Sequence, residues 1–233
     1  SGLFGGVLPD AITALARLLA TLHHPDGSVA VDGLVARDAD PLDLTDDEIR
    51  AAADAVDGLE LIGTGSLTSR LWHQPAIAVL GIDAPSTAEA ANALIPVARA
   101  KVSMRLAPGQ DPTAAMDALT AHLEARVDWG AEVTVHRGAA GEAFELGTES
   151  AAHEAWATGF RAAWGIDPVE IGVGGSIPFV AAFAEAMPDA PILLTGVIDP
   201  TGNAHGPNES VDLEDLRKSC VAQAIALAEL GGP

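Results

Sequence analysis

The sequence predicts a mixed α/β and α+β protein built in two parts. Over about the first 140 residues it predicts an α+β sandwich, and beyond them an alternation of strands and helices. The chain has 233 residues, 48% of them apolar, enough for one large domain or two small ones. Val97–Leu106 alternates between apolar and polar residues like a half-buried strand, whereas strand and helix patterns take turns from about residue 145.

In the first part, three segments carry helix-start signals. Pro9–Asp10 precedes an apolar stripe, Thr45 and Glu48 form a capping box, and Asp111–Pro112 precedes a second stripe. The stripes comprise Ile12, Leu15, Leu18, Leu19 and Leu22, then Met116, Leu119, Leu123 and Val127. Together with strands at Val97–Leu106 and Glu132–Val135, these helices predict an antiparallel sheet covered on one face.

In the second part, helices are expected over Ser150–Trp164, Ile177–Met187 and Val211–Leu230. Short strands are expected at Val169–Ile171 and Ile192–Leu194, an order that gives parallel pairing with ligands at the carboxyl ends of the strands. Two strands cannot close a doubly wound sheet, so we expect its other strands to lie outside this sequence. The single cysteine, Cys220, permits no intrachain disulfide, and we interpret it as a buried thiol.

The acidic composition argues against two classes of partner. The chain has 33 acidic and 12 basic residues, a formal net charge of −21. Such a surface repels nucleic-acid phosphates and anionic lipid, and no apolar run approaches the roughly 20 residues that span a bilayer. We therefore expect no nucleic acid and no membrane as partners. The N-terminus shows no targeting signal, and we expect a cytoplasmic protein.

A glycine-rich turn, Gly172–Pro178, separates a predicted strand from a predicted helix. Ser176 is placed to cap the helix, and Gly174 and Gly175 allow free amides to approach a ligand. The turn could therefore bind a carboxylate or a phosphate. A tight turn with a capping serine and no ligand explains the same spacing.

His205 lies in a loop rich in Gly, Pro and Asn that follows the last predicted strand. A core histidine more often lies on an apolar face, so we favour metal ligation or acid–base chemistry for His205. Asn203, Asn208 and Glu209 could fix the tautomer of its imidazole. We interpret the remaining histidines as structural, among them His73, His122, His136 and His153.

Arg105 ends the alternating strand, whose polar face also carries Arg99 and Lys101. A guanidinium group suits a carboxylate ligand, and the two neighbouring cations would strengthen the local positive field. The alternative is an exposed arginine paired with a nearby acid.

Four segments in this order resemble the zinc-dependent dipeptidases of the carnosinase, aminoacylase and carboxypeptidase type. They are Ser1–Gly6, Arg105–Pro112, Gly174–Pro178 and Asn203–Glu209. The resemblance covers essentially the whole chain. It implies a ferredoxin-like lid and dimerisation domain over residues 1–140, followed by the C-terminal part of an α/β catalytic domain over residues 141–233.

The resemblance also implies roles for individual residues. His205 takes the place of a zinc ligand, and Arg105 that of the lid arginine that binds the substrate carboxylate. The loop of Gly174, Gly175 and Ser176 would help to hold that carboxylate, and Asn92 would reach across the dimer towards the substrate. The family's two zinc ions need further ligands. Those ligands, the glutamate general base and the lid histidine have no counterpart in this sequence.

We therefore expect the C-terminal portion of a dinuclear zinc dipeptidase, in which a metal-activated water attacks the peptide carbonyl. The chain would supply carboxylate recognition and one zinc ligand, form a homodimer through the lid, and be inactive alone. Two alternatives remain open: an amidohydrolase of the same family acting on N-acyl amino acids, and a non-catalytic dimerisation or binding module.

Overall fold

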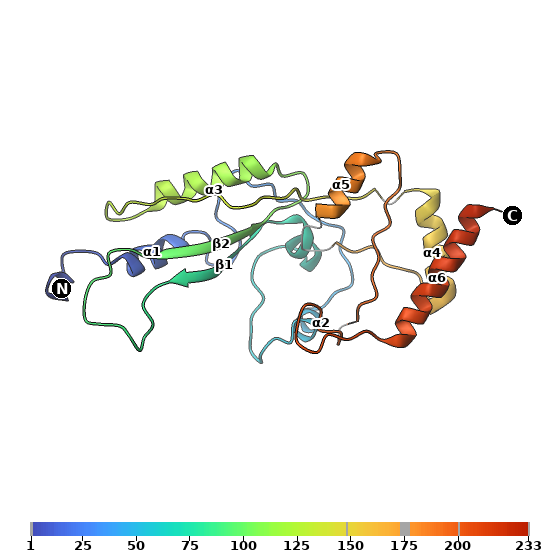
Figure 1. Ribbon diagram of the computed structural model, residues 1–233, viewed down its shortest axis with the longest axis horizontal. Coiled ribbons are helices and arrows are strands. Elements are labelled where there is room, and N and C mark those ends of the chain that lie inside the picture. The colour runs from blue at the N-terminus through green and yellow to red at the C-terminus, as the bar shows by residue number, and fades with distance from the viewer. Residues whose placement is uncertain (1, 148, 173–177, 200, 233) are drawn as a thin grey trace. The chain divides into compact units, whose positions relative to one another are not determined.

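The computed structural model describes residues 2–147, 149–172, 178–199 and 201–232 (Figure 1). The described chain divides into two compact units. Unit 1 comprises residues 2–144 with Gly172, and unit 2 comprises residues 145–171 and 178–232. Both units contain helices, and unit 1 also contains a small antiparallel sheet, in agreement with the predicted mixed fold class.

The α-helices of unit 1 begin where capping side chains are available. Asp10 accepts the Thr13 amide at 2.9 Å, the Thr45 capping box forms in both directions, and Asp111 accepts the Ala114 amide at 2.6 Å. The helical elements are the 3-10 helix η1 (Gly2–Phe4), α1 (Ala11–Ala20), α2 (Asp46–Ala52), the π-helix η2 (Ser69–His73) and α3 (Pro112–Arg126). The three α-helices confirm the predictions made from the sequence.

The sheet pairs β1 (Ala76–Asp83) with β2 (Arg99–Arg105), as Figure 1 shows. Ala76 lies opposite Arg105, and the register shifts between Val79 and Gly81. Exposed and half-buried residues alternate along β2, as predicted. The sequence does not predict β1, because Ala76–Ile82 is mainly apolar and does not alternate.

The core of unit 1 lies where α1, α3 and β1 meet. Its buried members are Leu18, Leu22, Val31, Ile77, Leu119 and Leu123. The prediction of a strand at Glu132–Val135 is wrong: among the described residues, the sheet contains β1 and β2 only. Val133 and Val135 nevertheless pack against the core. The alternation therefore reports a buried face correctly, but a strand also needs a neighbouring backbone with which to pair.

Unit 2 contains α4 (Ala151–Trp164), α5 (Pro178–Ala186) and α6 (Leu213–Gly231). α4 is capped by Ser150 and ends at Gly165 with a positive φ of 77°, as its sequence predicts. α4 and α6 pack closely through small residues: Ala155, Gly159, Ala222 and Ala226 are buried. This packing explains why Cys220 is exposed, against our prediction, since alanines form the buried face of α6.

The strands predicted at Val169–Ile171 and Ile192–Leu194 are also absent from the described part of unit 2. Neither segment pairs with a strand in the described chain. Val169 (63%) and Leu194 (47%) are exposed, whereas Ile192 and Leu193 are half-buried. Of the predicted strands and helices, the described part of unit 2 therefore contains the helices only.

Among the described helices, none is both long enough and apolar enough to cross a membrane.

Candidate functional site

Arg105 lies at the end of β2 and is half-buried. Its Nη2 donates a hydrogen bond of 2.8 Å to the Arg70 carbonyl, and its Nε is buried without a partner. Burial lowers the pKa of Arg105 below its usual range, and the guanidinium still stays charged near neutrality. Among the described residues no ion pair joins Arg105 to an acid. The cation is therefore desolvated and not neutralised.

The π-helix η2 supplies the carbonyl that contacts Arg105. A buried hydroxyl cluster lies at the start of η2: Thr68 and Ser69 are each 1% exposed, and Ser66 Oγ lies 3.0 Å from Thr68 Oγ1 and 2.6 Å from Ser69 Oγ. Sequence reasoning missed this cluster, because a single π turn has no periodic pattern and Ser and Thr are common in loops. A serine-rich turn one strand away from Arg105 was the available signal.

Asn92 is exposed and lies in the connection between β1 and β2. Its amide oxygen occupies the space beside Gly2, where a Cβ would lie 2.8 Å away. Close to Asn92, the Ile95 carbonyl accepts the Ala11 amide at 2.8 Å, which ties this connection to the start of α1. Gly174, Gly175 and Ser176, the remaining predicted carboxylate-binding residues, lie outside the described residues.

His205 belongs to unit 2 and lies in an exposed loop with unusual backbone geometry. Asn203, His205 and Asn208 all have positive φ, at 50°, 62° and 59°. Asn203 Nδ2 donates to the Pro207 carbonyl at 2.6 Å, so this side chain bridges the residues on either side of His205. In the described chain, no hydrogen bond joins His205 to Asn203, Asn208 or Glu209.

Asp199 lies at the start of the same loop. Its Oδ1 accepts the Thr201 amide at 2.7 Å and also the Thr201 hydroxyl, and these bonds lower the pKa of Asp199 below its usual 3.8. The Gly202 amide donates to the Asp199 carbonyl at 3.0 Å. Local hydrogen bonds therefore fix the shape of this loop without a ligand.

The described residues do not by themselves make a metal site. No group of three or more His, Cys, Asp or Glu side chains within them could hold a metal ion. A catalytic zinc needs about three protein ligands, so His205, which the sequence predicts as one of them, could not hold it alone.

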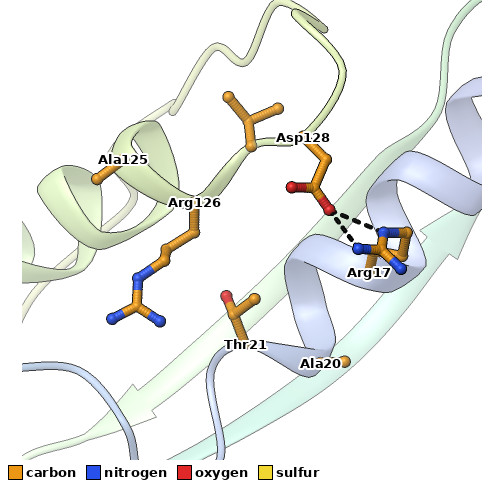
Figure 2. A pocket seen from close by; sticks show the side chains of 7 residues that line it. Arg17, Ala20, Thr21, Ala125, Arg126 and Asp128 are labelled. Carbon is orange, nitrogen blue, oxygen red and sulfur yellow. Dashed lines mark hydrogen bonds and ion pairs between the residues drawn. The ribbon is translucent and has the colours of Figure 1, made fainter.

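A pocket of about 460 Å³ lies in unit 1 between the ends of α1 and α3 (Figure 2). Arg17 on its wall pairs with Asp128 at 2.7 Å and lies 4.9 Å from the centre of the Trp129 ring. Near this pocket His122 is buried, with Nε2 3.0 Å from the Thr21 carbonyl. Burial lowers the pKa of His122, and Arg126 lowers it further. His122 is therefore a structural histidine, as predicted.

Relatives of known activity match almost the whole chain. It is 30% identical to the cysteinylglycine-S-conjugate dipeptidase of Corynebacterium striatum and 26% identical to a Cys-Gly metallodipeptidase of Saccharomyces cerevisiae. These matches include 99% and 93% of this chain but 52% and 47% of the relatives. The chain therefore spans about half the length of the curated relatives that it matches.

Solved structures show the same fold. Human carnosine dipeptidase 1 matches 100% of this chain and 52% of its own, with a TM-score of 0.75 and 23% identity. The yeast dipeptidase Dug1p matches 100% and 51%, with a TM-score of 0.74 and 20% identity. Residues 1–131 match the family model of the peptidase dimerisation domain of M20 proteins. Since this match includes more than half of the chain, the chain belongs to the M20 peptidase dimerisation-domain family.

Proposed function

We propose that this chain is the carboxylate-recognition and dimerisation portion of a cytoplasmic, homodimeric zinc dipeptidase. The observation that carries the proposal is Arg105, a half-buried cation with no acidic partner in the described chain. A buried guanidinium without a counter-charge is costly unless an anion binds to it. The C-terminal carboxylate of a dipeptide is such an anion.

In this proposal the two parts of the chain have different roles. Residues 1–140 form the lid and dimerisation domain, and residues 141–233 form the C-terminal part of the catalytic domain. The dimerisation-domain match over residues 1–131 supports the first assignment, and the division of the chain after Phe144 supports a boundary near residue 140. Asn92 would reach the substrate bound to the partner subunit.

Arg105 would bind the substrate carboxylate. The scissile peptide bond would then lie at a fixed distance from the C-terminus of the substrate. Such anchoring favours short substrates, because a longer peptide would present an uncharged amide where the carboxylate binds. Gly174, Gly175 and Ser176 would donate backbone hydrogen bonds to the same carboxylate. His205 would be one zinc ligand, with Asn203, Asn208 and Glu209 around it, and the other ligands would come from the half of the protein that this chain does not include.

Carboxylate recognition can be tested with Arg105→Ala in the full-length enzyme. We expect kcat/KM for a dipeptide to fall about tenfold to a hundredfold, since a charge-assisted hydrogen bond contributes about 1.5–3 kcal/mol. The corresponding dipeptide amide should show little change, because it has no carboxylate to lose. Arg137→Ala is the matched control, since Arg137 is an exposed arginine that pairs with Asp117. An equal loss on both substrates after Arg105→Ala would contradict the proposal.

A further inference from the structure

The carbonyl that contacts Arg105 lies at the end of a helix. η2 is followed by Gln74 in an extended conformation, with φ −116° and ψ 149°, and then by Pro75. Carbonyls in the last turn of a helix have no N–H partner within it, and proline has no N–H to offer. The Arg70 carbonyl is such a group, and Arg105 Nη2 donates to it at 2.8 Å.

This contact fixes the guanidinium at a second point. The Arg105 backbone is already held by its pairing with Ala76 at the start of β1. Its Nε is buried, so the side chain is shielded from solvent between β2 and the end of η2. The orientation of the guanidinium therefore depends on where the Arg70 carbonyl lies.

Ser69, the residue before Arg70, is tied to two other segments. Its Oγ accepts the Ala39 amide at 3.0 Å and lies 2.6 Å from Ser66 Oγ, while its own amide donates to Ser66 Oγ at 3.1 Å. Ser69 is 1% exposed, so no water replaces these bonds if its hydroxyl is removed. The start of η2 is thus held between the segment around Ala39 and the turn at Ser66.

We propose that Ser69 is a positioning residue: its buried hydroxyl fixes the Arg70 carbonyl and, through it, the direction in which Arg105 offers its guanidinium to the substrate carboxylate. This inference rests on the proposed role of Arg105. Ser69 itself touches neither substrate nor reacting atoms.

Thr68 offers a matched control in the same cluster. It is as buried as Ser69, at 1% exposure, but its hydroxyl contacts Ser66 Oγ and not the Ala39 amide. Thr68→Val therefore removes a buried hydroxyl from the cluster and keeps the contact between Ser69 and Ala39. A loss of activity that merely reflects weaker packing of the cluster should appear in both variants.

The kinetic test compares Ser69→Ala with Thr68→Val in the full-length enzyme, on a dipeptide and on its C-terminal amide. We expect Ser69→Ala to raise KM for the dipeptide about three- to tenfold, with kcat nearly unchanged and the amide unaffected. Thr68→Val should leave both substrates unchanged. A Ser69→Ala effect that is equal on dipeptide and amide, or that Thr68→Val reproduces, would overturn the inference.

A second measurement needs no substrate and uses this chain itself. Exchange of the Arg105 Nε proton with water, followed by ¹⁵N NMR, should be at least tenfold slower than that of exposed Arg99, and at least fivefold faster in Ser69→Ala than in the unchanged chain. Equal rates for Arg105 and Arg99 in the unchanged chain would overturn the inference even if Ser69→Ala did not fold.

The two experiments separate the two hypotheses. If Arg105→Ala affects dipeptide and amide alike, the carboxylate role of Arg105 is wrong, whatever the exchange rates show. If Arg105→Ala discriminates between them and Ser69→Ala changes neither KM nor exchange, only the positioning role of Ser69 is wrong.

Discussion

Gly159 of α4 lies against the backbone carbonyl of Ala222 of α6. A Cβ at position 159 would overlap that oxygen and would lie 2.9 Å from its carbon. Both contacts are with backbone, which cannot move aside as a flexible side chain can. The close approach of these two helices therefore requires glycine at position 159.

Gly159→Ala should destabilise unit 2 by about 1–3 kcal/mol, because the added methyl group forces α4 and α6 apart. Gly231→Ala is the control: it makes the same substitution at the end of α6, where a Cβ meets nothing within 4 Å. Urea unfolding followed by circular dichroism measures both. Equal stability of the two variants would show that the helices are not packed as described.

His122 should make the stability of unit 1 depend on pH. Its pKa in the folded chain lies below the usual 6.5, first through burial and then through Arg126. Between these two pKa values the unfolded chain binds more protons, so the stabilisation is complete above about pH 6.5 and is lost as the pH falls through the folded value. Urea unfolding midpoints between pH 5 and 7.5 should show this slope, and His122→Gln should reduce it. An unchanged slope in His122→Gln would assign the effect to other groups.

The loop around His205 should show coupling between Asn203 and Gly206. A Cβ at Gly206 would lie 2.5 Å from the Asn203 side-chain oxygen, whereas Asn203→Ala removes that side chain. Gly206→Ala should therefore disturb the loop strongly by itself and only weakly in the Asn203→Ala background. Hydrogen exchange of the Gly206 and Ser210 amides, which donate to Asn203 and Gly202, reports the change. Strictly additive effects would contradict the contact, and Glu209→Ala provides an exposed control.

Cys220 should react with a thiol reagent in the native chain, because its side chain is exposed. We expect one equivalent of thiol to be modified by Ellman's reagent without denaturant, at a rate within about tenfold of that in the unfolded chain. If the thiol reacted only after unfolding, it would be buried in the native chain, as the sequence predicts.

The helices were predictable from the sequence because their starts are local. Asp10, Thr45, Asp111 and Ser150 each bond to an amide three residues later, so a short stretch of sequence contains the whole signal. The strands were predicted less well: the alternation over Val97–Leu106 predicted β2, but the other strand predictions failed, because a strand exists only with a paired neighbour. Glu132–Val135 has a suitable pattern and no partner in the described chain, whereas β1 lacks the pattern and has a partner in β2.

The candidate site divides in the same way. Arg105 and His205 could be selected from residue type and position, at the end of a strand and in a polar loop. The hydrogen bonds that hold Arg105 in place could not be predicted. They depend on the Arg70 carbonyl, which has no N–H partner within its π turn, and on a buried serine more than 30 residues away along the chain. Hydrogen bonds of this kind are set by tertiary structure, and no local pattern records them.

The register shift between Val79 and Gly81 separates the sheet into two halves that can vary independently. The half from Ala76 to Val79 contains the partner of Arg105, and the half beyond Gly81 leads into the connection that carries Asn92. Insertions or deletions in that connection can change the pairing beyond the bulge without altering the pairing at Arg105. The bulge thus separates the length of this connection from the position of Arg105, the residue that we propose binds the substrate carboxylate.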